Sequence, residues 1–153
     1  MDFYREFSEN NGSCIGFMNS DNYDKWLEMM QNRHLGKNLP EGFVRENFYL
    51  CYEGEKLVGV YSFKFELTDY LLKYGGHVGY AVRPTEQGRH LATEILRHGL
   101  ALAKDFGFSE IPAVCDEDNY PSEKVILKNG GVLQNTLFDP EENVTVKRYL
   151  ITV

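Results

Sequence analysis

The chain has 153 residues, the length of one ordinary domain, and its ten Tyr, ten Phe and one Trp exclude a disordered protein, which lacks such bulk. Its 16 Lys and Arg against 23 Asp and Glu give a net charge of −7, so we expect no nucleic-acid partner. No apolar run could span a membrane and residues 1–20 do not resemble a signal peptide, so we expect no membrane partner.

The first predicted element is a helix from Asp21 to His34, because its apolar residues recur at helical spacing. Either Asp21 or Asn22 is expected to cap its start, and Gly36 is expected to end it. The residues expected on its buried side are Trp26, Leu27 and Met30, with Met29 at the margin.

Strands are predicted next. The segments Phe43 to Tyr52 and Leu57 to Leu67 flank a turn at 53–55, so they predict an antiparallel hairpin with one buried face. Residues 69–74 are expected to form either a loop or a single helical turn. His77 to Val82 is then predicted to be another strand, which Arg83-Pro84 ends.

The clearest predicted helix runs from Arg89 to Phe106, and Gly107 suits the left-handed position that follows many helices. Its expected apolar stripe is Leu91, Ala92, Ile95, Leu96, Leu102, Ala103 and Phe106. The segment Ile111 to Cys115 is predicted to be a short strand.

A further helix is predicted to start at Pro121 and to end at 129–131, with Val125 and Ile126 turned inward and Leu127 at the margin. Two strands, 132–138 and 144–153, complete the chain. This order predicts a single α/β domain over residues 1–153, with a mixed central sheet and helices on both faces. We expect parallel pairing near the middle of the chain and antiparallel hairpins at both ends.

Neither a disulfide framework nor a metal site is expected. The three cysteines lie far apart without a Cys-x-x-Cys pair, which fits a reduced, cytoplasmic setting. His90, Glu94 and His98 recur every four residues, but a solvated helix face explains them better than a metal, so we assign none. Cys115 is either an acyl-accepting nucleophile or, as we favour, a small buried thiol.

The segment from Val82 to Ala92 carries the clearest chemical signal. A strand enters a polar loop, and the loop opens the long helix, whose first N–H groups have no partner within the helix. A pyrophosphate is a natural ligand for such groups. Gly88 permits a close approach of the backbone, and Arg89 adds a cation. The alternative is an ordinary strand–loop–helix turn.

Two motifs together resemble the GNAT acyltransferases, which move an acetyl group from acetyl-CoA to an amine. Residues Gln87 to Ala92 align with their phosphate loop, R/Q-x-x-G-x-G/A. Their later motif aligns with Asn119, Ser122 and the Gly130-Gly131 pair. The segment 74–84 is similar to a subgroup of small predicted bacterial acetyltransferases. The resemblance extends from about Gly42 to Leu150.

The resemblance implies a splayed sheet whose free strand backbone binds the pantetheine arm of acetyl-CoA, the expected co-substrate. The loop would bind the pyrophosphate, Asn119 would hydrogen-bond the pantetheine, and Ser122 or Lys124 would lie near the cofactor. The residues implied to bind the cofactor are Ala81, Val82, Gln87, Gly88, Arg89, His90, Leu91, Ala92, Asn119, Ser122 and Lys124.

Two positions depart from the family pattern. His90 stands where the fourth motif residue is usually Gly. We expect binding to survive, because only the backbone N–H is needed and we place His90 inside the helix, where other residues are allowed. Ile126 stands where many members have a Tyr that protonates the departing CoA thiolate, so any general acid must come from elsewhere.

An attacking amine must first lose a proton, so a base is useful. The candidate catalytic residues are His77, Tyr80 and Glu66, with Asp69 as a further option. Each also has a structural explanation: His77 as a hydrogen-bond partner of a loop, for example, and Tyr80 as part of the core.

The sequence therefore predicts a bacterial, cytoplasmic N-acetyltransferase in which a primary amine attacks acetyl-CoA directly. The acceptor is expected to be a small molecule or a peptide, with an amino acid, a polyamine, a drug and a protein N-terminus all left open, as is a homodimer. One rival is a non-catalytic acyl-CoA-binding or sensing module, which Ile126 favours. The other is an interaction domain without CoA.

Overall fold

The computed structural model describes residues 2–10, 14–16 and 22–153. The helices are α1 (Asp2–Glu9), α2 (Tyr23–Leu35), α3 (Asp69–Tyr74), α4 (Leu91–Asp105) and α5 (Tyr120–Lys128), with a short 3-10 turn at Pro84–Glu86. The strands are β1 (Glu46–Glu53), β2 (Lys56–Lys64), β3 (Val78–Val82), β4 (Glu110–Asp116), β5 (Val132–Asp139) and β6 (Val144–Thr152). The predicted α/β class and order of elements are confirmed, and α1 is an addition to them.

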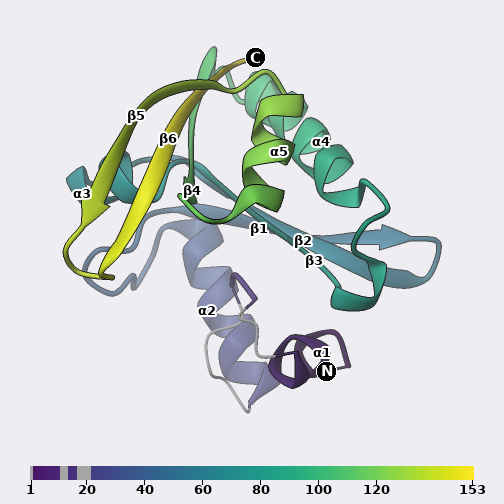
Figure 1. Ribbon diagram of the computed structural model, residues 1–153. Coiled ribbons are helices and arrows are strands. Elements are labelled where there is room, and N and C mark those ends of the chain that lie inside the picture. The colour runs from purple at the N-terminus through teal and green to yellow at the C-terminus, as the bar shows by residue number, and fades with distance from the viewer. Residues whose placement is uncertain (1, 11–13, 17–21) are drawn as a thin grey trace.

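The strands form two three-stranded sheets, β1-β2-β3 and β4-β6-β5, and every pairing between the described strands is antiparallel. The predicted parallel pairing in the middle of the chain is therefore wrong. An isolated bridge between Gly76 and Ala113 joins the approaches to β3 and β4, and the His77 N–H donates to the Pro112 carbonyl at 2.9 Å. Beyond this bridge, β3 and β4 diverge and belong to separate sheets (Figure 1).

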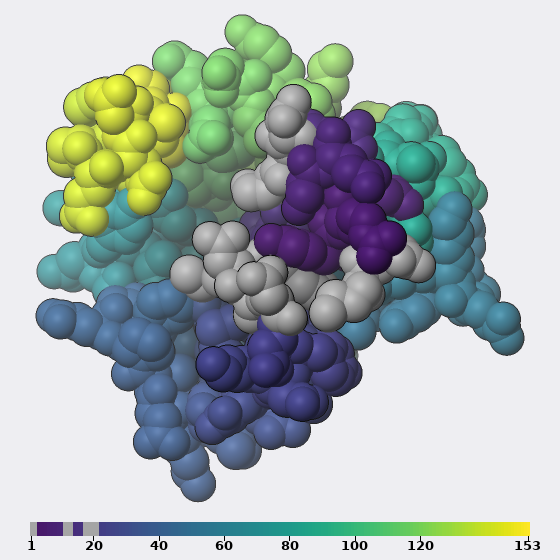
Figure 2. All heavy atoms as spheres, turned by 90° about the horizontal axis from the view of Figure 1, so that it is seen from below, coloured from purple at the N-terminus to yellow at the C-terminus, as the bar shows by residue number. Residues whose placement is uncertain are grey.

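Helices cover both faces of the β1-β2-β3 sheet (Figure 1). On one face, Tyr61 and Phe63 of β2 share a core cluster with Leu96 of α4. On the other face, Val60 packs with Phe3 of α1, and Figure 2 shows α1 and α2 spread over this face. Because successive strand residues point to opposite sides, β2 supplies both cores from alternate positions.

The helix faces differ from the prediction at four leucine and aromatic positions. Leu27 and Leu127 are exposed, as are Leu102 and Phe106 of the predicted α4 stripe. The buried face of α4 is therefore rotated from the predicted apolar face. The small residues Gly99 and Ala103 lie on the buried face and allow α4 to pack closely on β2. The residues of α4 that are buried are Ile95, Leu96, Gly99, Leu100 and Ala103.

The ends of α2 confirm the expected caps. The Asn22 side-chain oxygen accepts from the backbone N–H groups of Asp24 and Lys25, and Gly36 ends the helix with φ 64°. Asp21, the alternative cap, lies outside the described residues. Of the helices that the structure describes, none combines the length and apolar character needed to cross a membrane.

Candidate active site

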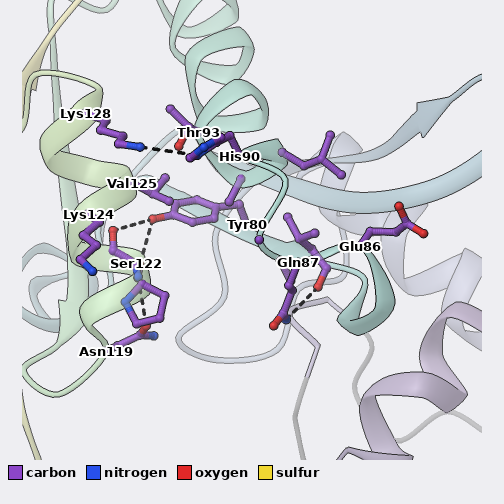
Figure 3. A pocket seen from close by; sticks show the side chains of 16 residues that line it. Tyr80, Glu86, Gln87, His90, Thr93, Asn119, Ser122, Lys124, Val125 and Lys128 are labelled. Carbon is purple, nitrogen blue, oxygen red and sulfur yellow. Dashed lines mark hydrogen bonds between the residues drawn. The ribbon is translucent and has the colours of Figure 1, made fainter.

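A cavity of about 620 Å³ opens beside β3 (Figure 3). Its walls come from β3, from the loop that leads into α4, from the first turn of α4, and from α5 along its length. The residues that line it are Tyr80, Ala81, Val82, Glu86, Gln87, Gly88, His90, Leu91, Ala92, Thr93, Asn119, Pro121, Ser122, Lys124, Val125 and Lys128. The structure thus brings together every predicted cofactor-binding residue except Arg89.

The loop before α4 owes its shape to two residues with left-handed backbone. Gly88 has φ 80° and His90 has φ 64°, and α4 begins directly after them at Leu91. The expectation that His90 lies inside the helix is therefore wrong: it is the N-cap residue, in a conformation that favours glycine. The His90 side chain makes no capping hydrogen bond to α4, and the first residues of the helix, 91–93, line the cavity.

The conformation of His90 leads to a prediction about stability. Replacing His90 with Gly should raise the free energy of unfolding by about 0.5–1 kcal/mol, because a side chain in left-handed geometry is strained. Acetyl-CoA affinity should stay within a few-fold, since the backbone N–H remains. Thermal melting and calorimetric titration check the two parts, and a hundredfold loss of affinity would instead make the imidazole a phosphate ligand.

Arg89 is turned away from the cavity lining. Its guanidinium contacts both carboxylate oxygens of Glu53, at 3.0 and 2.9 Å, and also pairs with Glu86. Glu86 is in turn paired with Lys56. The cation expected near a phosphate is therefore neutralised by two carboxylates, and Arg89 serves to hold the loop in place.

The basic groups that do line the cavity are Lys124, Lys128 and His90. Lys128 Nζ lies 3.5 Å from His90 Nδ1, so α5 and the loop bring their nitrogen atoms together (Figure 3). The sequence analysis missed Lys128. The signal that could have found it is its spacing of four residues from Lys124, which places both side chains on one face of α5.

Helix α1 holds the start of the loop between β3 and α4 in place. Glu6 of α1 accepts hydrogen bonds from Arg83 Nε at 2.7 Å and from Thr85 Oγ1 at 3.0 Å. The hydrogen bond from Arg83 is the main cause that lowers the pKa of Glu6. α1 therefore fixes the entry into the cavity-lining loop.

Tyr80 and Ser122 connect the two walls of the cavity. The Tyr80 hydroxyl lies 2.8 Å from Ser122 Oγ and 3.2 Å from the Ser122 carbonyl oxygen (Figure 3). Asn119 caps α5 by accepting from the Ser122 backbone N–H at 3.1 Å, which sets the position of Ser122. Burial raises the pKa of Tyr80 to about 12, so its phenol carries its proton at neutral pH.

The other candidate catalytic residues are placed elsewhere. Glu66 and Asp69 are exposed residues beyond the end of β2, and neither lines the cavity. His77 is buried: its ring stacks on Phe63 with centroids 5.7 Å apart, and its Nδ1 lies 2.6 Å from the Lys64 carbonyl oxygen. Of these residues, only Tyr80 reaches the cavity.

The packing of His77 predicts a structural role. His77→Ala should lower the free energy of unfolding by about 2–3 kcal/mol, because a buried ring is lost from the core. Burial also lowers the pKa of His77, so the native state resists protonation and stability should fall as the pH drops below the ordinary value of 6.5. The variant should lack this part of the acid sensitivity in denaturant melts. Loss of turnover with stability retained would contradict the structural role.

Two further side chains are held in the core. Ile126 is 1% exposed and contributes to the main core cluster, so its side chain points away from the cavity. Cys115 is buried, and burial raises the pKa of its thiol to about 11, which disfavours a thiolate nucleophile. Within the described part of the chain, no three His, Cys, Asp or Glu side chains converge on a potential metal position.

Comparisons with known proteins agree with this arrangement. Residues 16–132 match the family described as the acetyltransferase (GNAT) domain. Proteins with curated descriptions yield no match. Similar solved structures include the microcin self-immunity acetyltransferase MccE with acetyl-CoA and AMP, at TM-score 0.68 and 19% identity over 98% of this chain and 84% of that one.

Two more solved structures share the fold. The putative acetyltransferase yncA from Salmonella typhimurium, with acetyl-CoA, has a TM-score of 0.64 and 14% identity, covering 97% of this chain and 84% of that one. A variant of the spermidine N-acetyltransferase SpeG from Vibrio cholerae has a TM-score of 0.62 and 18% identity, covering 87% and 76%.

Proposed function

Because this chain belongs to the GNAT acetyltransferase family and is thus an acetyl-CoA-dependent acyltransferase, we propose that it acetylates a primary amine by direct attack on the thioester. The observation that carries the proposal is the cavity that the edge strand β3 shares with the start of α4 and with α5. A long, thin ligand with phosphates at one end suits this combination.

The proposed position of acetyl-CoA follows from the walls of the cavity. β3 is the edge strand of its sheet, so its outer backbone groups near Ala81 would pair with the amides of the pantetheine arm. At Val82 the carbonyl accepts from Gln87 Nε2 at 3.3 Å, and the arm would replace this side-chain donor. The pyrophosphate would lie over Gln87 to Ala92, at the N-terminus of α4. Lys124 and Lys128 would then supply the positive charge that Arg89 does not.

The acceptor is proposed to be a small-molecule or peptide amine. The net charge of −7 favours the approach of a cation. A solved structure that shares the fold at 18% identity belongs to a spermidine N-acetyltransferase, which makes polyamines a sensible first class to test. The amine reacts in its neutral form, because the protonated amine has no lone pair for attack.

The experiment that tests the function has two stages. Calorimetric titration of the full chain with acetyl-CoA should show binding, and release of free CoA should then rise on addition of an amine from a panel of spermidine, free amino acids and a short peptide. Binding without amine-dependent release would favour the acyl-CoA-binding module, and failure to bind acetyl-CoA would overturn both readings.

A further inference from the structure

Transfer of the acetyl group moves one proton in total. The amine nitrogen forms a bond to the carbonyl carbon, the carbon–sulfur bond breaks, and the amine nitrogen must lose a proton while the CoA sulfur gains one. A side chain that gives a proton to sulfur and later regains one from nitrogen would complete this exchange without any further reactant.

We propose that the Tyr80 hydroxyl is this proton donor and that Ser122 holds it in position. The inference rests on the proposed function. Tyr80 is the one phenol among the residues that line the cavity, and it comes from the same strand as Ala81 and Val82, where the pantetheine arm is placed. Its hydroxyl reaches across to the first turn of α5, so it lies in the cleft between the two walls (Figure 3).

The other proton-bearing groups of the cavity are less suited to the step. Lys124, Lys128 and His90 are placed at the proposed phosphate position, where Lys128 Nζ lies 3.5 Å from His90 Nδ1. Glu86 is paired with both Lys56 and Arg89. Cys115 lies outside the lining residues. The Tyr80–Ser122 pair is therefore the donor that the geometry offers next to the thioester end of the ligand.

The proton transfers of Tyr80 are coupled to the bond that breaks. Burial raises the pKa of the Tyr80 phenol to about 12, so the phenol enters the reaction with its proton. The sulfur takes this proton as the carbon–sulfur bond breaks, and the acetylated nitrogen, which is a stronger acid than the phenol while it carries its extra proton, drives the exchange forward. After the O–H bond breaks and the S–H bond forms, Ser122 Oγ–H can donate to the phenolate. The phenolate then takes the excess proton from the acetylated nitrogen.

The test compares two acetyl donors with one amine, the best acceptor of the panel. Tyr80→Phe keeps the ring and removes the proton. With acetyl-CoA, kcat should fall by about 10²–10⁴-fold, the usual contribution of a positioned acid–base group, while the Kd for acetyl-CoA is unchanged. With p-nitrophenyl acetate, whose nitrophenolate leaves without a proton, the rate should change little. Equal losses with both donors, or normal turnover of acetyl-CoA, would overturn the proposal.

Two further variants keep the test decisive. Tyr70→Phe is the matched control, because it also removes a phenol hydroxyl, here bonded to Asp139 at 2.6 Å, away from the cavity lining. Its kcat should match that of the wild type.

Ser122→Ala leaves the phenol but removes the side-chain partner, so kcat with acetyl-CoA should fall by about tenfold at unchanged Kd. An unchanged kcat in Ser122→Ala would refute the positioning role. If the wild type itself transfers nothing to any amine, the proposed function fails, independently of Tyr80.

Discussion

Acetyl-CoA affinity should fall by about 100-fold, or about 2.7 kcal/mol, when Gly88 is replaced by Val. Gly88 has φ 80°, a conformation that a β-branched residue adopts only with strain, and it lines the cavity with open space where a Cβ would stand. The substitution would therefore both distort the loop and place two methyl groups where the pyrophosphate is expected. Calorimetric titration measures the loss.

Gly107→Val is the matched control for this variant. Gly107 has φ 91° and equally open surroundings, but it lies at the far end of α4 and does not line the cavity. Both substitutions should therefore lower the free energy of unfolding by about 1–2 kcal/mol, while only Gly88→Val weakens binding. Equal acetyl-CoA affinity for the two variants would mean that the phosphates bind elsewhere.

The largest effect on stability should follow the loss of Arg33. Its guanidinium lies 2.8 Å from Glu46 and joins α2 to β1, and both side chains are less than a tenth exposed. In Arg33→Ala, the Glu46 carboxylate would stay buried with Lys64 Nζ, 3.8 Å away, as its remaining cation. Burial lowers the pKa of Lys64, so this cation is a weak replacement. We expect the free energy of unfolding to fall by about 3–5 kcal/mol in denaturant melts.

An exposed pair supplies the comparison for Arg33. Arg97 and Glu94 are 2.7 Å apart on α4 and more than half exposed, so Arg97→Ala should cost about 0–1 kcal/mol. Replacing Arg33 and Glu46 together with Leu should recover much of the loss, because the buried carboxylate is removed along with its partner. Burial lowers the pKa of Lys64, so this lysine can give up its proton when Glu46 is absent. A small cost for Arg33→Ala would show that Glu46 takes up a proton or reaches water instead.

Sequence reasoning was strongest where structure depends on neighbours in the chain. The cap at Asn22, the left-handed Gly36 and the hairpin around Gly54 are decided within a few residues. The phosphate-loop motif belongs to this group as well, since Gln87 to Ala92 are contiguous and line one cavity. Such features need only backbone preferences and side chains one turn away.

Sequence reasoning was weaker for side chains whose partners are distant in the chain. Arg89 was expected at a phosphate, yet it pairs with Glu53 from the β1–β2 hairpin. His77 was a candidate base with a structural role as the alternative, and its ring packs between Phe63 and Phe108. Both residues lie just outside the elements predicted for them, because β3 begins at Val78 and α4 begins at Leu91. The direction of each side chain depended on the packing of another element.

The sequence by itself determined the order of the elements, the α/β class and the position of the loop that opens α4, because periodicity, caps and turns act locally. The family resemblance implied a splayed sheet, but only the tertiary structure decided that β3 and β4 part at the bridge between Gly76 and Ala113. It also decided that Tyr80 meets Ser122, 42 residues away, across the resulting cavity. Such contacts depend on how the two sheets and α5 pack together, and no pattern within one segment carries that information.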